Sequence, residues 1–277
     1  MSSSVPAAAP SILTPHRPVN DPVVSARNLT KVYGRGSGAV TALDSVNVDI
    51  ARARFTAIMG PSGSGKSTLM HCLAGLDSIT SGEIMLDGDM VSSMSQRRLT
   101  RLRRERIGFI FQSFNLVPTL TAAENITLPL DIARRKVDSS RFDQVVNAVG
   151  LSDRLSHRPA ELSGGQVQRT ACARSLVGRP AVVFADEPTG NLDSRATQQV
   201  LKVLRSSVDD FAQSIVMVTH EAEAAAWADT VLFLRDGRVV AQMDEPDQDR
   251  VLEALHDLGR SEGGSIPEPT GEREPAL

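Results

Sequence analysis

Short apolar runs alternate with amphipathic helical patterns over most of this chain. Four runs have the near-continuous apolar character of a strand that is buried on both faces: residues 55–59, 181–185, 214–218 and 230–234. Apolar positions at helical spacing follow or separate them, at residues 66–74, 166–177 and 194–208. Strands that alternate with helices through short connections predict an α/β fold with a largely parallel sheet.

Composition divides the 277 residues into three parts. Residues 1–22 are rich in Ser, Pro and Ala, and residues 259–277 are rich in Gly, Pro and Glu. Such segments bury too little apolar surface to offset the entropy of ordering, so we expect both ends to be disordered. One domain, residues 23–258, lies between them. Its residues from about 90 to 165 are arginine-rich and lack a clear strand after Phe111, and we expect a helical insertion there.

Charge, cysteine content and hydropathy narrow the class of protein. The net charge of −3 gives no global sign of a nucleic-acid partner. Cys72 and Cys172 lie far apart, and we expect reduced, buried thiols in a cytoplasmic protein. No apolar run approaches the roughly 18–20 residues that span a bilayer, and no signal core begins the chain. We therefore expect a soluble chain that reaches a membrane only through a partner.

A glycine-rich segment follows the first apolar run. It reads Gly60-Pro61-Ser62-Gly63-Ser64-Gly65-Lys66-Ser67, then Thr68, and matches the phosphate-binding pattern G-x-x-x-x-G-K-[ST], the P-loop. Glycines let the backbone curl so that its N–H groups point at phosphate oxygens. Lys66 offers a cation to the β- and γ-phosphates and Ser67 a hydroxyl to Mg²⁺, at the positive end of the following helix. The flanking strand and helix disfavour the alternative of a flexible Gly/Ser loop.

An acidic pair, Asp186-Glu187, directly follows the second apolar run. Adjacent side chains at a strand end point to opposite sides. Asp186 can therefore hold the Mg²⁺ shell while Glu187 faces an attacking water as general base. The alternative, a surface acidic pair that caps the next turn, loses weight because a P-loop lies upstream.

A second candidate anion site begins another predicted helix. Leu162-Ser163-Gly164-Gly165-Gln166 places Ser163 where it can cap the helix, and two glycines leave backbone N–H groups bare at its positive end. This site has no lysine of its own. Taken by itself, the pentapeptide could equally be an ordinary capped turn.

In this order, these segments resemble the motifs of ABC transporter ATP-binding subunits. Residues 162–166 resemble the family signature, and Asn191-Leu192-Asp193 resembles the D-loop. Gln112, Tyr33 and His220 resemble the Q-loop glutamine, the aromatic that stacks on adenine and the switch histidine. The match covers residues 23–240. It implies a P-loop NTPase fold of the ABC type, with a mostly parallel core sheet, an antiparallel β subdomain and an inserted helical subdomain.

The resemblance also implies a mechanism with ATP and Mg²⁺. Two copies would pair head to tail, so that Ser163, Gly164 and Gly165, with Gln166 and Asp193, reach the ATP held by the partner's P-loop. Gln112 would join Ser67 and Asp186 around Mg²⁺, Glu187 would polarise water, and His220 and Lys66 would contact the γ-phosphate. Taken singly, His220 could be structural, Gln112 a surface side chain and Tyr33 a packing residue.

Two further stretches resemble the branch of macrolide exporters, lipoprotein-release and cell-division ATPases: residues 74–77 and residues 113–125. This resemblance implies an integral membrane permease with a large extracytoplasmic domain as partner, and a peripheral position on the cytoplasmic face of the membrane. We expect export or lipoprotein- and envelope-directed transport. The alternative is an ATPase of a non-transport, mechanotransmission complex in cell division or the envelope. A nucleic-acid-associated ABC ATPase is disfavoured, because the chain has neither a second nucleotide domain nor a long coiled coil.

Residues 97–106 contain six arginines. They could bind lipid headgroups or an acidic partner. The simpler interpretation, which the sequence favours, is a solvated helix face with Leu99 and Leu102 packed inward.

Overall fold

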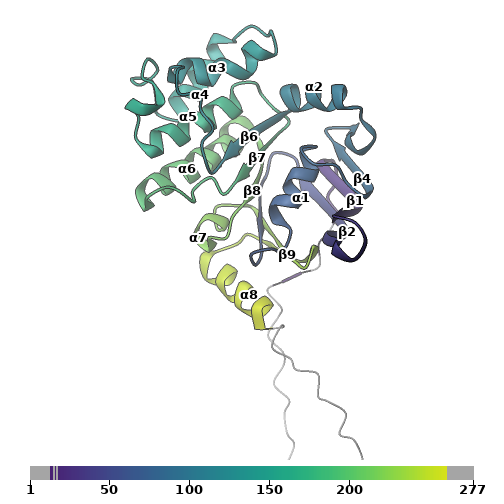
Figure 1. Ribbon diagram of the computed structural model, residues 1–277. Coiled ribbons are helices and arrows are strands. Elements are labelled where there is room, and N and C mark those ends of the chain that lie inside the picture. Colours follow the sequence, from purple (N-terminus) through teal and green to yellow (C-terminus); the bar gives the residue numbers. More distant parts are fainter. Residues whose placement is uncertain (1–12, 15, 17, 261–277) are drawn as a thin grey trace, which may run out of the picture.

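The computed structural model describes residues 13, 14, 16 and 18–260 of the chain (Figure 1). Its strands are β1 (Pro22–Tyr33), β2 (Val40–Ala51), β3 (Phe55–Met59), β4 (Ser81–Leu86), β5 (Asp89–Met90), β6 (Ile107–Phe111), β7 (Val182–Asp186), β8 (Ser214–Val218), β9 (Thr230–Arg235) and β10 (Arg238–Asp244). Its α-helices are α1 (Lys66–Leu73), α2 (Gln96–Arg106), α3 (Ala122–Ile132), α4 (Ser139–Ala148), α5 (Gly164–Leu176), α6 (Ser194–Phe211), α7 (Ala222–Ala225) and α8 (Gln248–Arg260).

Six strands form the core sheet, in the order β10-β9-β3-β8-β7-β6. All neighbours are parallel except β9 and β10, which form an antiparallel pair. The four strands predicted from apolar runs are β3, β7, β8 and β9, each within one residue of the expected bounds. The expectation of a largely parallel α/β sheet is confirmed.

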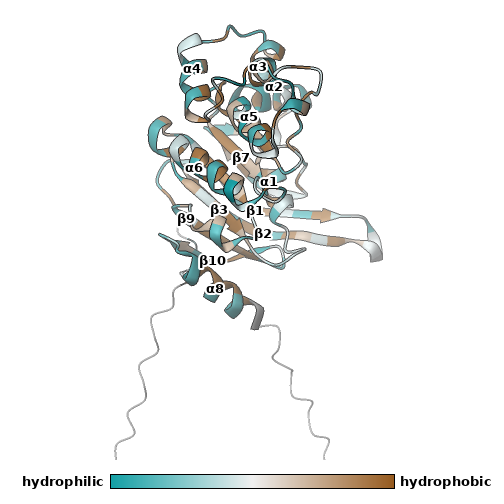
Figure 2. Cartoon of the chain, turned by 90° about the vertical axis from the view of Figure 1, so that its left-hand side faces the viewer, coloured by the Kyte–Doolittle hydropathy of each residue, from teal (hydrophilic) through white to brown (hydrophobic). Residues whose placement is uncertain are grey.

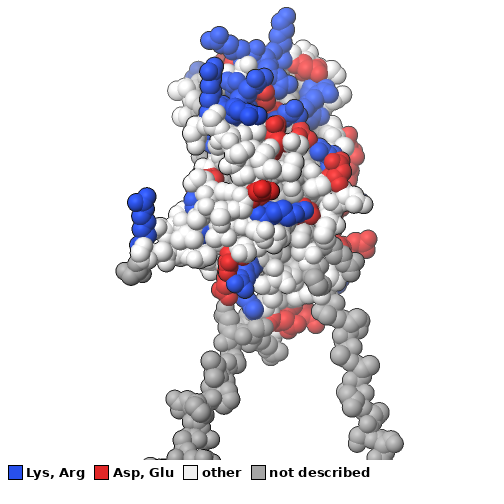
Figure 3. All heavy atoms as spheres, turned by 90° about the vertical axis from the view of Figure 1, so that its right-hand side faces the viewer, with Lys and Arg blue, Asp and Glu red and all other residues white. Residues whose placement is uncertain are grey.

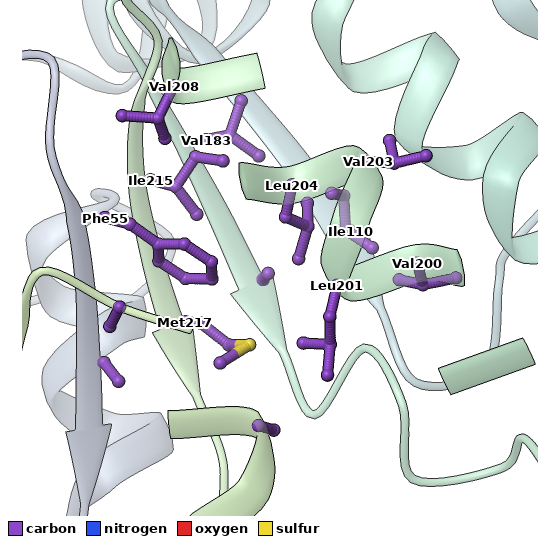
Figure 4. Close-up of a cluster of buried hydrophobic side chains, with 14 of the residues drawn as sticks. Phe55, Ile110, Val183, Val200, Leu201, Val203, Leu204, Val208, Ile215 and Met217 are labelled. Carbon is purple, nitrogen blue, oxygen red and sulfur yellow. The ribbon is translucent and has the colours of Figure 1, made fainter. Parts of the chain in front are cut away.

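Alternate residues of the central strands enter two different hydrophobic cores, as the two-residue period of a strand requires. Phe55, Val183, Ile215 and Met217 point toward α5 and α6, where Leu201 and Leu204 of α6 meet them (Figure 4). The intervening Ile58, Phe184 and Val216 enter the core that α1 closes. In Figure 2 the strands of the core sheet are largely brown, or apolar, and lie inside, whereas the outer surface of the helices is largely teal, or polar.

The antiparallel β subdomain is the second sheet, in the order β2-β1-β4-β5. Its long strands are irregular: β1 and β2 pair with several register shifts, and Asn28 and Ser45 have positive φ. Such bulges interrupt the alternation of buried and exposed side chains. This irregularity explains why apolar periodicity alone did not locate β1 and β2.

The range expected as a helical insertion, about 90 to 165, needs a correction. It contains β6, which pairs in parallel with β7 from Ile107 to Phe111 and is an edge strand of the core sheet. The helices α3 and α4 and the start of α5 form a unit beyond this strand (Figure 1). The strand is hard to recognise in the sequence because it directly follows the arginine-rich helix α2, with no turn residues between them.

The expected disorder of both ends is wrong where the structure describes them. Thr14 exchanges backbone hydrogen bonds of 3.0 and 2.8 Å with Gln242 of β10. The His16 ring lies between the Gln242 side chain (2.8 Å) and the Asp49 backbone N–H (2.9 Å). At the other end, α8 continues to Arg260. The remainder of both predicted tails lies outside the described residues.

Both cysteines are free and buried, as expected. Over the described part of the chain, no helix is both long and apolar enough to cross a bilayer.

Candidate nucleotide-binding site

Four parallel strands bring the sequence-predicted residues to one edge of the core sheet. Phe111 pairs with Asp186, Asp186 with Val218, and Val218 with Ile58. The residues that follow these strand ends therefore lie side by side: Gly60, Gln112, Glu187 and His220. The carboxyl ends of parallel strands are where α/β folds place their ligands.

The P-loop has the backbone that its glycines permit. Gly60 has a φ of 151°, and a Cβ there would lie 2.0 Å from the Leu234 carbonyl oxygen. Gly65, with a φ of 101°, is the N-cap of α1 and supplies no side-chain cap, so the first N–H groups of α1 stay available to an anion. Only glycine fits either position.

Polar side chains of the P-loop point toward the inside of the loop. Lys66 Nζ donates to the carbonyl oxygens of Gly60 (2.9 Å) and Pro61 (2.8 Å). Ser64 is buried, and its hydroxyl has no hydrogen-bond partner in the described part of the protein. Ser62 and Gly63 are exposed on the surface of the loop. Burial lowers the pKa of Lys66, although the charges of Glu187 and Asp186 partly offset this effect.

Asp186 stands next to the first turn of α1. Its carboxylate lies 3.4 Å from the Ser67 hydroxyl and 3.8 Å from His71 Nε2. Burial raises the pKa of Asp186, and the Glu187 charge adds to that rise, whereas His71 and Ser67 oppose it. A half-buried carboxylate with a hydroxyl beside it suits a hard divalent cation such as Mg²⁺, which uses few protein ligands.

Glu187 and His220 face each other across the end of the sheet. His220 Nδ1 lies 3.1 Å from Glu187 Oε1. Glu187 has a φ of 44°, and its backbone N–H donates to the Val218 carbonyl at 2.9 Å. A left-handed conformation is unfavourable for a residue with a side chain and is typical of functional positions. It is held here by the neighbouring strand.

Gln112 is joined to the loop that follows the acidic pair. Its side-chain Nε2 lies 2.8 Å from where a Cβ on Gly190 would be, so glycine at that position leaves room for the Gln112 side chain. Asn191 donates to the Gln112 carbonyl at 3.1 Å. Gln168 of α5, which the sequence analysis missed, is fully buried and donates to the carbonyls of Pro188 (2.5 Å) and Phe111 (3.4 Å). A single glutamine in an amphipathic helix gives no sequence signal for this bridge.

The signature segment, residues 162–166, packs against the start of α6. Ser163 caps α5: its hydroxyl accepts from the Gln166 N–H (3.3 Å), and Gln166 accepts in return from the Ser163 N–H (2.8 Å). A Cβ on Gly165 would lie 2.8 Å from the Ala196 Cβ, so this glycine also serves packing. Among the described residues, no hydrogen bond joins the signature segment to the P-loop of the same chain.

Asp193 and Tyr33 both have structural partners. Asp193 caps α6 by accepting from the Ala196 N–H at 2.8 Å. Tyr33 ends β1 and is 42% exposed. Its hydroxyl donates to Asp77 at 2.6 Å and interacts with Thr68, and Lys31 Nζ lies 4.6 Å from its ring centroid. These contacts hold the ring beside α1.

Comparisons with known proteins agree with this geometry. A protein-family model described as "ABC transporter" matches residues 43–190. The ABC transporter ATP-binding protein MJ1508 of Methanocaldococcus jannaschii is 46% identical over 220 residues, covering 79% of this chain and 98% of that protein. The macrolide export ATP-binding/permease protein MacB of Bdellovibrio bacteriovorus is 43% identical over 223 residues, which is 80% of this chain but 34% of that longer protein.

Among solved structures, the dimeric, post-hydrolysis form of the ATP-binding cassette MJ0796, bound to ADP and Pi, matches with a TM-score of 0.72. The sequences are 37% identical, and the match covers 81% of this chain and 99% of that one. The P-loop, the acidic pair and the signature segment thus stand in a chain that follows these cassettes over almost their full length. The chain belongs to the ABC transporter family, and it is an ATP-binding subunit with ATPase activity.

Proposed function

We propose that two copies of this chain pair head to tail, and that each hydrolyses the ATP held between its own P-loop and the partner's signature segment. The observation that carries the proposal is the arrangement of two anion-binding helix ends. α1 begins beside Lys66, whereas α5 begins with no cation of its own. No acceptor meets the N–H groups of Gly164 and Gly165 among the described residues. A second chain's nucleotide would satisfy them.

The residues at the strand ends would then divide the work. Ser67, Asp186 and Gln112 would hold Mg²⁺, which neutralises charge on the phosphates. Glu187 would accept the proton of the attacking water. With its proton on Nδ1, His220 donates to Glu187 and fixes the direction of the carboxylate. Lys66 and the free N–H groups of α1 would stabilise charge on the phosphates, which is the main contribution of protein to phosphoryl transfer.

The substitution Glu187→Gln tests the assignment of the base. It removes the proton acceptor and keeps the shape, so hydrolysis should fall by about 10²- to 10⁴-fold while ATP still binds. We expect the variant to accumulate as an ATP-bound dimer in size-exclusion chromatography. Wild-type turnover in this variant would remove Glu187 from the role of base.

A hollow next to Gln112 suits a segment of a membrane permease. It has a volume of about 250 Å³ and a largely apolar wall that includes Ile107, Phe109 and Phe111 of β6. Arg174 lines it and donates to the carbonyls of Phe114 (3.0 Å) and Asn115 (2.5 Å), which both have positive φ. A segment seated there would press on the loop from Gln112 to Asn115. Because Phe111 pairs with Asp186, that pressure would reach the nucleotide site.

This docking site can be tested by crosslinking in membranes. A cysteine in place of Arg104, which is exposed on the rim of the hollow, should crosslink to an integral membrane protein. The matched control is Lys202→Cys on α6, which is exposed and lies in a different part of the surface. Equal crosslinking from both positions, or crosslinking from Lys202→Cys alone, would contradict the proposed docking site.

We place the chain peripherally on the cytoplasmic face of the membrane, with a permease that has a large extracytoplasmic domain, in export or in lipoprotein- and envelope-directed transport. The stretches at residues 74–77 and 113–125 support this branch. So do relatives named for macrolide and bacitracin export. The protein crosslinked through Arg104→Cys identifies the permease, and a permease without an extracytoplasmic domain would contradict the placement.

A further inference from the structure

Exposed cationic side chains from three separate segments gather on one face of the molecule. They come from α2, from Arg135 and from Arg179, and together they are called the arginine face here. Figure 3 shows a dense blue cluster in the upper part of that view, whereas charges of both signs are scattered over the rest of the visible surface. The whole chain carries a net charge of −3, so positive charge is concentrated on this face.

The arginine face is built on an ordinary amphipathic helix. Leu102 of α2 is buried and Leu99 packs beside it against the core, as the sequence analysis expected. The outward positions of α2 are then left to its arginines, with Glu105 as the one acidic side chain of the helix. What the sequence did not show is that the chain brings further cations to the same place. Arg106, Arg135 and Arg179 line one surface hollow of about 360 Å³.

The carboxylates of the protein neutralise only part of this face, and Asp138 pairs with Arg179 at 3.0 Å. Glu105 pairs with Arg101 at 3.0 Å, and Asp87 pairs with Arg106 at 2.7 Å. Arg97 and Arg98 are exposed and have no ion pair or hydrogen bond within the described part of the chain. Like charges that exceed the carboxylates beside them repel one another and favour an anionic partner.

The position of the arginine face indicates what that partner is. Glu105 and Gly178 line both the basic hollow and the apolar hollow proposed for the permease, so the two are adjacent. A subunit docked through the apolar hollow would hold the arginine face close to the membrane surface. We propose that the arginine face binds anionic phospholipid headgroups and so adds a lipid contact to the contact with the permease. The orientation of the arginine face toward the membrane rests on the proposed docking site, whereas its affinity for anionic lipid does not.

Vesicle sedimentation tests this binding without any permease. The full-length protein should sediment with vesicles of phosphatidylcholine and phosphatidylglycerol, less so in high salt, and should stay in solution with phosphatidylcholine alone. The combined substitution Arg97→Gln, Arg98→Gln and Arg101→Gln should lower partition onto the anionic vesicles by roughly ten- to a hundredfold. ATPase activity, measured alongside, shows that the variant is folded.

The matched control removes three positive charges from outside the arginine face: Arg154→Gln, Lys202→Gln and Arg250→Gln. It should keep wild-type sedimentation. Equal losses in the two triple variants, or no sedimentation of the wild type, would overturn the proposal. So would normal sedimentation of the arginine-face variant. If instead that variant only weakened capture of the permease, the face would bind an acidic protein segment. Crosslinking through Arg104→Cys decides the docking site separately.

Discussion

At the scale of single residues, the nucleotide site contains a backbone conformation and a carboxylate environment that each lower the stability of the fold. Glu187 adopts a left-handed backbone, and Asp186 keeps a carboxylate in a setting that raises its pKa. Such conformations persist where the surrounding strands determine them, and they are typical of sites that are prepared for a ligand. The sequence identified both residues, because an acidic pair after a buried run is a local pattern. The backbone strain at Glu187 depends on the neighbouring strand, so the sequence around the pair does not predict it.

The raised pKa of Asp186 predicts a gain in stability from Asp186→Asn. A carboxyl whose pKa is higher in the folded state than in the unfolded state lowers stability when it is ionised, and this penalty disappears as the pH falls through the folded pKa. Without nucleotide and at neutral pH, the free energy of unfolding of the variant should exceed that of the wild type by about 1 kcal/mol, and the variant should unfold at a higher temperature. The difference from wild type should shrink in acid, while Mg²⁺-dependent hydrolysis is lost.

Asp193→Asn is the matched control for this experiment. Asn caps a helix about as well as Asp, so the thermal stability should not change. Thermal denaturation of both variants across pH, followed by circular dichroism, makes the comparison. A destabilised Asp186→Asn protein at neutral pH would contradict the account of the desolvated carboxylate.

At the scale of elements, apolar runs in the sequence located the four central strands of the core sheet. They did not locate β6, β1 and β2, or the pairing of the N-terminal segment with β10. β3, β7, β8 and β9 are continuous apolar segments, so their burial is visible in the sequence. β6 directly follows an arginine-rich helix without a turn, and β1 and β2 are bulged. The pairing of Thr14 with Gln242 joins residues 228 positions apart, which no local pattern could predict. The sequence predicted that the P-loop and the acidic pair each follow a buried strand, but it did not predict the burial of Gln168.

The two glycines of the signature segment should differ in their effect on stability. A Cβ on Gly165 would press on Ala196 of α6, whereas the nearest atom to a Cβ on Gly164 belongs to Leu192 at 3.8 Å. Gly165→Ala should therefore destabilise the protein by about 1–3 kcal/mol through overpacking. Gly164→Ala should be neutral or stabilising by up to about 1 kcal/mol, because alanine loses less entropy in a helix.

Urea denaturation of the two variants without nucleotide measures this difference directly. Because both glycines belong to the same signature segment, each variant is the control for the other. Equal stability of the two proteins would show that α6 gives way at Ala196, and that Gly165 is not needed for packing.

At the scale of the whole molecule, one chain carries a P-loop site and a separate, cation-free helix end that packs beside the D-loop. The strand ends bring Gly60, Gln112, Glu187 and His220 together within one subunit. The signature segment is instead seated on α6, through Gly165 and Ala196. In the proposed closed dimer, each chain would complete the other's site, and the apolar hollow and the arginine face would connect the pair to the membrane.

Mixing two inactive variants is the most direct test of this composite site. Lys66→Ala removes the P-loop cation and Ser163→Arg blocks the signature segment, so each variant alone should hydrolyse almost no ATP. In mixed dimers, the intact P-loop of the Ser163→Arg chain meets the intact signature of the Lys66→Ala chain. We predict that an equal mixture recovers up to about a quarter of the wild-type rate, since half of randomly paired dimers contain one intact site of two. A mixture as inactive as its components would contradict the composite site.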